Sequence, residues 1–401
     1  MFCMAFHVKP LTRKRGRPYH KPVNLRRRAG ILLALLALPL LSSCVSVLNP
    51  TGWAPVVFDG DTAYVVTSKG RLSAVSLNGD SAQAKWTFPD PDRDSDDDFR
   101  TRAIYGAPIV DGDRIYVATF AGGVFALNKE DGRPIWPAAG PNDSEIDGNI
   151  TGGLAMAGDN LYFGTTEGRL YAWKKSDGTP APGWEKPRSF DGGIWATPIV
   201  DGDTIFVATM KGHVYALSAA DGSERWVEPF SSTAAVPELA LVGEDLLFVA
   251  SINRHAYLLK RSDGVEVADY RAEDWLWTAP AESGSTLYFG DFGGKVYALN
   301  ITSSGLEEAW AADVDGQRVR SGPVVIEGVL VLADREPEVW FFNTQDGAKL
   351  NSVPIPDAGT VRANLVVHEG NAYFATTNGR LFRAEPQSRR VVEIQLSGVK
   401  R

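Results

Sequence analysis

The chain has 401 residues, of which 44% are hydrophobic and 22% are charged, so a large globular core is expected. The first 44 positions hold nine basic residues and no acidic one; without them 32 basic residues face 49 acidic ones, a net charge of −17. That charge excludes binding to a nucleic-acid backbone, and with only two cysteines, Cys3 and Cys44, the rest of the chain has no disulfide and no thiolate metal site.

The first 44 residues have the pattern of an export signal. The basic stretch is followed by an apolar run over 31–41, which is too short for a permanent transmembrane helix of roughly 20 residues. The next residues, Leu41-Ser42-Ser43-Cys44, resemble the lipobox of bacterial lipoproteins, which implies that Cys44 is acylated and becomes the first residue after cleavage. The alternatives are an ordinary signal peptide, an uncleaved anchor and, for the basic stretch, a nucleic-acid patch.

The signal sets the predicted domain boundaries. We predict a signal peptide over 1–43, a lipidated tether over 44–50 and one folded domain over 51–401. Residues 23–44 alone form a complete lipoprotein signal, so we expect translation to start near Val23 from a non-AUG codon, with 1–22 untranslated.

From about residue 50 onward the sequence repeats with a spacing of 41 to 52 residues. The clearest copies are Ala-Pro-Ile-Val-Asp-Gly-Asp over 107–113 and Thr-Pro-Ile-Val-Asp-Gly-Asp over 197–203. We expect the glycine of this motif to supply the positive φ of a tight hairpin, followed by a second, alternating strand. The glycine recurs eight times, at Gly60, Gly112, Gly158, Gly202, Gly243, Gly284, Gly328 and Gly370.

Each unit is predicted to contain four short strands, and units of this length are typical of β-propeller blades. One blade cannot bury both of its faces, whereas a closed ring can, and closure removes exposed sheet edges. We therefore predict an all-β fold, a single eight-bladed β-propeller of four-stranded antiparallel blades over 51–401. The closure of the ring stays open: the last strand, near 391–396, pairs with the first blade, or blade eight is self-contained.

Several units end in a tryptophan that follows an Asp-Gly turn. The segments Ala-Leu-Asn-Lys-Glu-Asp-Gly-Arg-Pro-Ile-Trp over 126–136 and Ala-Leu-Ser-Ala-Ala-Asp-Gly-Ser-Glu-Arg-Trp over 216–226 resemble the tryptophan-docking motif of the quinoprotein (PQQ-type) propellers. The resemblance implies that each such tryptophan packs on the equivalent turn of the neighbouring blade, as a structural contact. Five units carry it, at Trp86, Trp136, Trp184, Trp226 and Trp310, and three have lost it, near Tyr270, Asn351 and Ile394.

The family that the chain resembles includes two kinds of protein. PQQ-dependent dehydrogenases carry an acidic base, a calcium site and commonly a vicinal cysteine pair; here there is no such cysteine pair, and no acidic set is recognisable by spacing. The chain is more similar to the BamB-type lipoproteins of outer-membrane β-barrel assembly, in which a lipobox precedes a single eight-bladed propeller without a cofactor. This implies a non-enzymatic scaffold for protein partners such as a barrel-assembly subunit, with neither PQQ nor calcium, and a monomeric propeller.

Val45 follows Cys44, and Val rather than Asp at this position implies sorting to the periplasmic side of the outer membrane in a host with two membranes. In a host with one membrane the protein would lie on the extracellular face of the cell membrane, where the assembly role is impossible. Two other functions stay open: a generic cell-surface propeller that binds a ligand or polymer, and a PQQ-dependent dehydrogenase.

The start of the first strand of each blade is expected to line the central channel. Aromatic residues together with arginines are typical of binding hot spots, so this level is a candidate binding site at the channel mouth. The alternative is that bulky side chains only plug the channel. The residues concerned are Tyr105, Trp195, Trp277, Arg320 and Arg362.

A second set of residues follows the glycine that precedes each third strand, and most of its members are basic. It is a candidate basic face for an acidic partner, a peptide or a lipid headgroup, or else a solvated turn position. The set comprises Arg71, Arg169, His213, His255, Lys295 and Arg380. Two histidines without a third ligand make a poor zinc site, so no metal is predicted there.

The acidic run from Asp90 to Asp98 joins the first two units and superficially resembles a calcium loop. It lacks the glycine and the final glutamate that such a loop requires, so a solvated loop is expected and weak calcium binding stays open. No nucleophile elbow, zinc-protease, P-loop or dinucleotide-binding motif is present, and we predict no catalytic residue.

Overall fold

The computed structural model describes residues 52–67, 70–92, 103–136, 146–315 and 317–399. The chain divides into two units, 1–49 and 50–401, and every described residue belongs to the second. The predicted signal peptide 1–43, Cys44, the tether 44–50 and the greater part of the acidic run lie outside the described residues.

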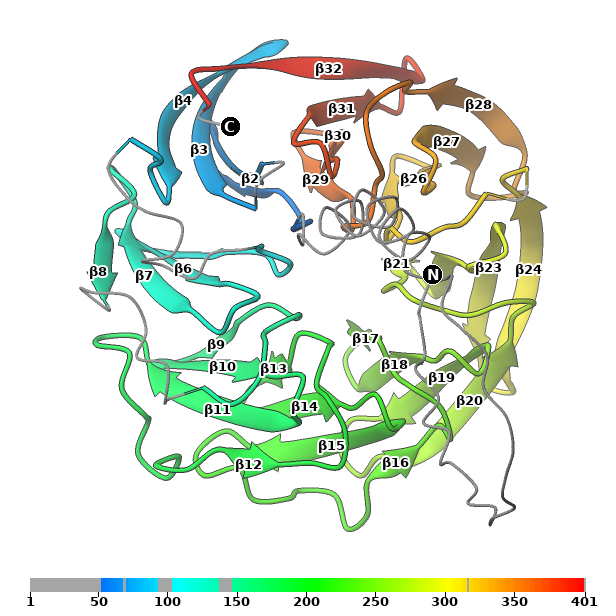
Figure 1. Ribbon diagram of the computed structural model, residues 1–401. Helices are drawn as coiled ribbons and strands as arrows, with labels where there is room; N and C mark the ends of the chain where they lie inside the picture. The colour runs from blue at the N-terminus through cyan, green and yellow to red at the C-terminus, as the bar shows by residue number, and fades with distance from the viewer. Residues whose placement is uncertain (1–51, 68–69, 93–102, 137–145, 316, 400–401) are drawn as a thin grey trace, which may run out of the picture. The chain divides into compact units, whose positions relative to one another are not determined.

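The described residues form strands and no helix, arranged as eight blades of four antiparallel strands (Figure 1). Blades 1 to 4 are β1–β4 (Val57–Asp59, Thr62–Val66, Leu72–Asn78, Ser81–Phe88), β5–β8 (Ile109–Asp111, Arg114–Ala118, Val124–Asn128, Pro134–Trp136), β9–β12 (Ala155–Ala157, Asn160–Gly164, Arg169–Lys174, Arg188–Ser189) and β13–β16 (Ile199–Asp201, Thr204–Ala208, His213–Ser218, Phe230–Ser231). Blades 5 to 8 are β17–β20 (Glu238–Val242, Leu246–Ala250, His255–Lys260, Glu266–Arg271), β21–β24 (Ala281–Ser283, Thr286–Gly290, Lys295–Thr302, Gly305–Asp313), β25–β28 (Val324–Ile326, Val329–Ala333, Glu338–Asn343, Lys349–Pro354) and β29–β32 (Val366–His368, Asn371–Ala375, Leu381–Glu385, Arg390–Ser397). This confirms the predicted all-β propeller.

Each blade starts with a tight hairpin at the predicted glycine, and all eight of these glycines have a φ between 51° and 80°. The strand after the hairpin differs from the prediction. It does not alternate between buried and exposed residues: one partly buried residue is followed by four buried ones in every blade. The reason is that both faces of the strand are covered, because each blade packs between two neighbours.

The hydrophobic core is divided into eight layers, one between each pair of neighbouring blades. The layer between blades 1 and 2, for example, joins Tyr64 of β2 to Phe125 of β7. The layer between blades 8 and 1 joins Tyr373 of β30 to Val65 of β2, so the last blade packs on the first. Apolar burial at roughly 25 cal/mol per Å² in every layer stabilises the ring.

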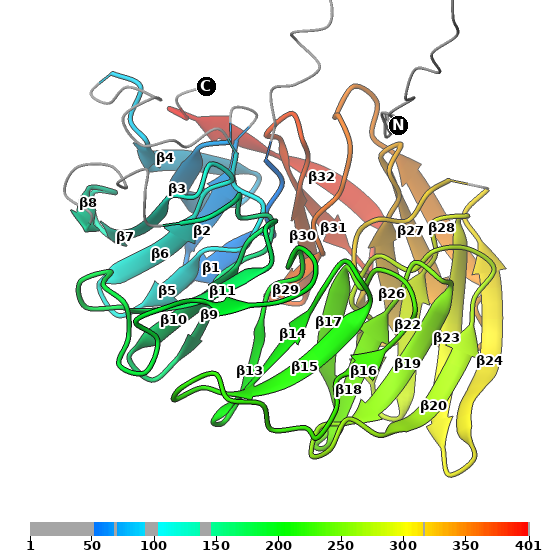
Figure 2. The ribbon, with the colours of Figure 1, turned by 60° about the horizontal axis from the view of Figure 1, so that its bottom comes forward.

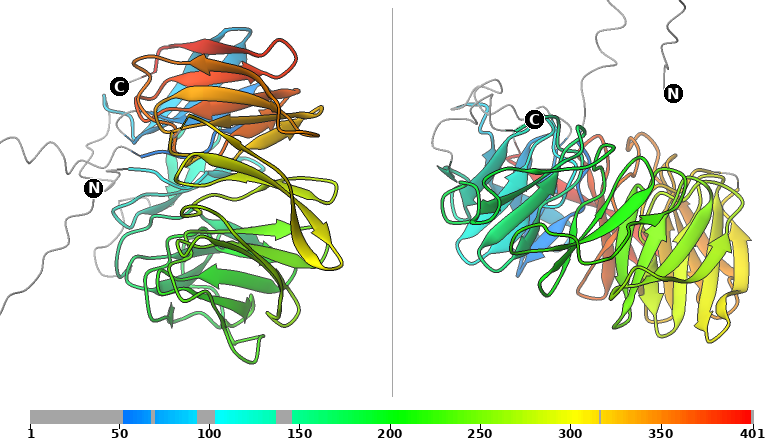
Figure 3. Two further views of the ribbon diagram at one scale, coloured as in Figure 1. Left: turned by 90° about the vertical axis from the view of Figure 1, so that its right-hand side faces the viewer. Right: turned by 90° about the horizontal axis from the view of Figure 1, so that it is seen from below.

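The ring closes through both of the arrangements that the sequence left open. Blade 8 is complete in itself, and its outermost strand β32 also pairs in parallel with β4 of blade 1, with Gln395 opposite Ser81 (Figures 2 and 3). Arg383 of β31 adds an ion pair to Asp80 at 2.7 Å, between residues that are 303 positions apart in the chain. Hydrogen bonding and charge therefore join the two terminal blades.

The antiparallel order gives the ring two ends. The turns between first and second strands and between third and fourth strands lie at one end, here called the hairpin end. The turns between second and third strands, and the links between blades, lie at the other, the mouth end. At the hairpin end, cations of one blade pair with acids of the preceding blade, such as Lys129 with Asp59 at 2.8 Å and Lys175 with Asp111 at 2.9 Å.

The five motif tryptophans join neighbouring blades at the hairpin end. Each indole nitrogen donates a hydrogen bond of 2.9–3.0 Å to a backbone carbonyl in the next blade, on Lys129, Lys175, Ala219, Arg261 and Thr344 in chain order. Each indole ring also covers a turn glycine of that blade, where an added Cβ would lie 2.4–2.7 Å from a ring atom: Gly132, Gly178, Gly222, Gly264 and Gly347.

Strand register corrects which residues replace the missing tryptophans. In blades 1 and 6 the tryptophan is the fourth-strand residue that directly follows the extra residue of a β-bulge. Blade 5 has the same bulge, and the residue that follows it is Ala268, two positions before Tyr270. In blade 8 the equivalent residue is Val392, two before Ile394, whereas Asn351 of blade 7 is as predicted. The register thus gives the exact residue in each of the three blades, within two positions of those named from the sequence.

Candidate functional site

The mouth end carries a cluster of four arginines, Arg318, Arg320, Arg335 and Arg362, called here the arginine cluster. Arg318 and Arg320 lie in the link from β24 to β25, Arg335 in the turn from β26 to β27, and Arg362 in the link from β28 to β29. The turn and the first link are fastened together, because the amide of Arg335 donates to the carbonyl of Arg318 at 2.8 Å and Val319 forms a β-bridge with Asp334.

Aromatic rings lie beneath the arginines. The guanidinium of Arg320 is 4.6 Å from the ring centre of Trp277 and that of Arg362 is 4.7 Å from Trp53, which is 4.2 Å from Tyr105. The Arg318 guanidinium lies 5.3 Å from the Phe292 ring. Stacking of this kind holds a guanidinium by its flat face and leaves its N–H edge available for an acceptor.

None of the four arginines has a carboxylate within ion-pair distance among the described residues. The Nε of Arg320 is buried and has no hydrogen-bond partner. Burial, together with repulsion from Arg362 and Arg335, lowers the pKa of Arg320 to about 10, and burial also lowers the pKa of Arg362. The cluster therefore keeps its positive charge at neutral pH and lacks a counter-ion in the described part of the chain.

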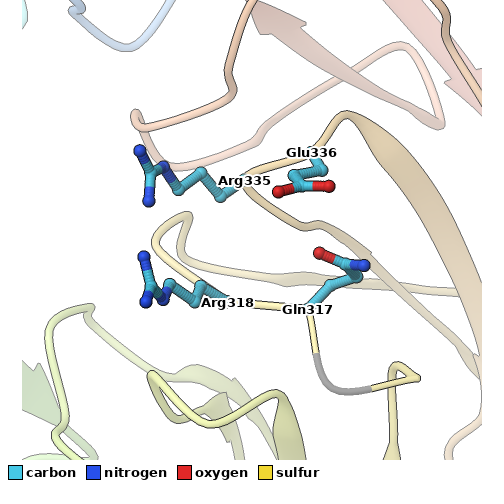
Figure 4. A pocket seen from close by; sticks show the side chains of 4 residues that line it. All are labelled: Gln317, Arg318, Arg335 and Glu336. Carbon is cyan, nitrogen blue, oxygen red and sulfur yellow. The ribbon is translucent and has the colours of Figure 1, made fainter.

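A pocket of about 260 Å³ opens beside the cluster, lined by Gln317, Arg318, Arg335 and Glu336 (Figure 4). The side chains of Arg318 and Arg335 extend in the same direction, away from the carboxylate of Glu336, so that two guanidinium groups lie on one side of the pocket (Figure 4). An anion that enters on that side would meet donors from two connections at once.

The sequence also identifies the chain by comparison with known families. A family model described as outer membrane protein assembly factor BamB matches three times, over residues 46–186, 121–270 and 259–399, and the matches together reach all eight blades. The chain belongs to the BamB family. No curated protein matches the chain.

Solved structures similar to this BamB-family propeller differ widely in what they are. BamB from Moraxella catarrhalis has a TM-score of 0.65 at 17% identity and covers 86% of this chain and 95% of its own. The computationally designed Ika8 protein scores 0.63 at 12% identity (86% and 98%), and quinohemoprotein alcohol dehydrogenase from Comamonas testosteroni scores 0.63 at 13% identity (83% and 70%). At such identities the likeness shows the fold alone.

The structure brings together four of the five predicted mouth residues. Tyr105, Trp277, Arg320 and Arg362 are all part of the contacts described above, with Tyr105 joined through Trp53. Trp195 lies in the link between β12 and β13, and no ring or cation contact with the cluster is found for it among the described residues. The predicted site is therefore centred on blades 6 to 8 and extends to the start of blade 1.

Sequence reasoning missed Trp53, Phe292, Arg318 and Arg335. Trp53 is two residues before a proline rather than three, so a count of three positions passes over it. Phe292 and Arg335 both follow a buried aspartate, Asp291 or Asp334, at one repeat position. A comparison of the residue after this aspartate in all units would identify both of them. Arg318 does not lie at a position that recurs in the repeat.

The candidate basic face is a row of side chains paired with acids of the same blade or of the link that enters it, not a continuous free positive stripe. His213 lies 3.1 Å from Asp191 and His255 lies 2.8 Å from Asp269. The other paired members are Arg169 with Asp147, Lys295 with Glu273, and Arg380 with Glu393. Arg71 is buried, at 5% exposure. The acids come from the fourth strand of the same blade or from the link that enters it, so the repeat position of the basic residues alone does not show them.

Two negative findings concern the described residues only. No group of three or more His, Cys, Asp or Glu side chains there is placed to hold a metal ion. A helix long and apolar enough to cross a membrane is likewise not found among them. Of the acidic run, only Asp90 to Asp92 are described, and the amide of Asp92 donates to the carboxylate of Asp90 at 3.1 Å.

Proposed function

We propose that the protein is a non-enzymatic scaffold, anchored to a membrane by lipid on Cys44, that holds protein partners during outer-membrane β-barrel assembly. The observation that carries the proposal is the match of the BamB family over residues 46–399, directly after the lipobox-like Leu41-Ser42-Ser43-Cys44. The BamB structure from Moraxella catarrhalis supports it through the shared fold. On this proposal the propeller lies on the periplasmic side of the outer membrane.

A PQQ-dependent dehydrogenase is the competing function, because one structural neighbour is a quinohemoprotein alcohol dehydrogenase. The residues of the mouth do not fit a calcium-bound quinone. Calcium takes six to eight oxygen ligands, several of them carboxylates, whereas the described side chains at the mouth are stacked arginines that would repel the ion. We therefore propose that calcium is not a cofactor of this chain. That PQQ is not one either is proposed from the resemblance to the BamB-type lipoproteins, whose propeller has no cofactor.

Affinity purification of the full-length lipidated protein from its own membranes, followed by mass spectrometry, tests the scaffold role. We expect an outer-membrane barrel-assembly subunit to be recovered. A Cys44→Ser variant is the control for the anchor and should be lost from the membrane fraction. Recovery of transporter or cell-wall components without any barrel-assembly protein would overturn the assembly role, and dye reduction with an alcohol or sugar in the presence of added PQQ and calcium would overturn the non-enzymatic one.

A further inference from the structure

We infer that the arginine cluster at the channel mouth is a binding site for an acidic peptide segment of a partner protein. The inference rests on the proposed scaffold function for one point only, that the ligand is a protein. It adds the chemistry of the ligand and the residues that bind it.

The arginine cluster differs in charge pairing from the other cations of the ring. Net charge without the first 44 residues is −17, yet Arg318, Arg320, Arg335 and Arg362 gather at one mouth, and none of them has a described carboxylate within ion-pair distance, although Glu336 lines the same pocket. Other cations of the ring are paired at both ends: Lys175 and Arg261 pair with acids at 2.9 and 2.7 Å at the hairpin end, and Arg169 pairs with Asp147 at 3.2 Å at the mouth end. Cations that repel one another in a partly buried site are unfavourable, and an external anion would offset that cost.

The geometry of the arginines suits a carboxylate ligand. Arg320 and Arg362 are held by their flat faces on Trp277 and Trp53. The Nε of Arg362 donates to Thr360 Oγ1 at 3.1 Å, whereas the Nε of Arg320 is buried without a partner. No hydrogen bond of the terminal N–H groups of either is found among the described residues, so these groups remain as donors. Guanidinium edges match the planar carboxylate, with which they form paired hydrogen bonds. The arginines come from three separate connections, and a ligand with several carboxylates would contact them together.

An exposed tryptophan beside the cluster favours a peptide over a lipid headgroup. Trp275, which is 47% exposed and 5.9 Å from Phe292, adds an apolar contact beside the cluster. It is the single large exposed hydrophobic residue of the described chain that touches a ring of the cluster, and one residue is too little to insert into a bilayer. A segment with acidic and apolar side chains uses both the arginines and Trp275.

Direct binding to the full-length lipidated protein in non-ionic detergent tests the inference. The probe is a fluorescently labelled synthetic peptide in which glutamate alternates with serine and phenylalanine, read by anisotropy. We expect the triple variant Arg320→Gln, Arg335→Gln, Arg362→Gln to bind it at least about tenfold more weakly, because each lost charge-assisted hydrogen bond weakens binding about tenfold or more. The matched control removes three arginines from the hairpin end: Arg114→Gln, Arg133→Gln, Arg225→Gln. It should bind like the parent.

Thermal unfolding shows whether the triple variant is folded. Without peptide its Tm should equal or exceed that of the parent, because three mutually repelling cations are removed, and the rise in Tm that peptide gives the parent should be absent. Equal binding by parent and triple variant overturns the inference, as does equal binding of a peptide with glutamine in place of glutamate. Arginine-dependent binding of anionic phosphatidylglycerol vesicles, or full displacement of the peptide by inorganic phosphate at equal concentration, would assign the site to a phosphate ligand instead.

The outcome is independent of the affinity purification. Peptide binding that depends on the cluster, with no barrel-assembly subunit recovered, leaves the site intact and removes the assembly role. Recovery of that subunit by a protein that does not bind acidic peptide leaves the scaffold intact and removes the site.

Discussion

The junctions between blades are of two kinds, and the difference shows what the repeated motif contributes. At five junctions a tryptophan covers a glycine of the next blade. At the other three another residue takes the tryptophan position, and only one of the three has also lost the glycine. Ala268 takes the tryptophan position opposite Gly305, with only 3.7 Å between its Cβ and an added Cβ, and Gly79 at the closing junction has open space around it. At the third, Asn351 donates to the carbonyl of Arg389 at 2.9 Å. Two of the three undocked turns keep their glycine, and the turn that faces Asn351 carries Arg389 instead, so a turn without an indole tolerates a side chain.

The three undocked junctions lie between blades 5 and 6, 7 and 8, and 8 and 1, the part of the ring that also carries the arginine cluster. At the last of them, strand pairing of β32 with β4 and the ion pair of Arg383 with Asp80 provide the contact. The regular part of the ring repeats one stabilising contact, and the irregular part combines individual contacts with the candidate site.

Removing a docked tryptophan should have the largest effect. Trp136 is 6% exposed and donates to the carbonyl of Lys175 at 3.0 Å, so Trp136→Ala should lower the free energy of unfolding by about 3–5 kcal/mol, as measured by urea denaturation. Trp275→Ala is the control, since that side chain is 47% exposed and should change stability by less than about 1 kcal/mol. Equal effects of the two substitutions would show that the docking contact is not a main source of stability.

The glycine half of the pair can be tested separately. Gly178 has a φ of +71°, and an added Cβ would lie 2.4 Å from Trp136, whereas Gly60 has a φ of +55° and open space around it. Gly60→Ala should cost about 1–2 kcal/mol for the left-handed backbone alone, and Gly178→Ala should cost at least about 1 kcal/mol more because the indole must move. Urea denaturation of both variants measures the difference. Equal costs would mean that the indole of Trp136 moves aside without a loss of stability.

These contacts also show which parts of the fold and of the candidate site could be predicted from the sequence. The eight hairpins followed from glycines at repeat positions, because only a tight turn places a glycine there at every copy. The arginine cluster was found only in part, since Arg320 and Arg362 share a repeat position with the aromatic residues but Arg318 does not. Ion-pair partners such as Asp269 for His255 depend on how strands and links come together, which the residue spacing does not encode.

The first strand of blade 5 differs from those of the other blades, and it should make the free energy of unfolding depend on pH. β17 has five residues and starts at Glu238, and burial raises the pKa of this carboxyl to about 7. The folded state then binds a proton more tightly than the unfolded state, so stability falls as pH rises from about 4.5 through about 7. Glu238→Gln should match the parent near pH 4 and exceed it by roughly 1–3 kcal/mol near pH 8. Urea denaturation at several pH values checks this, and parallel curves for the two proteins would contradict it.

The smallest change in the free energy of unfolding is expected at a turn that no tryptophan covers. It should have the opposite sign from the change at a turn that a tryptophan covers. Arg389 has a φ of +55° and an exposed side chain, and the residue facing its turn is Asn351 rather than tryptophan. Arg389→Gly should therefore raise the free energy of unfolding by about 0.5–1 kcal/mol: relief of the left-handed strain exceeds the entropy that glycine adds to the unfolded chain. Gly347→Ala, at the turn covered by Trp310, should lower it by more than about 2 kcal/mol. If both substitutions shift the urea midpoint in the same direction, the indole does not explain why one turn carries glycine and the other arginine.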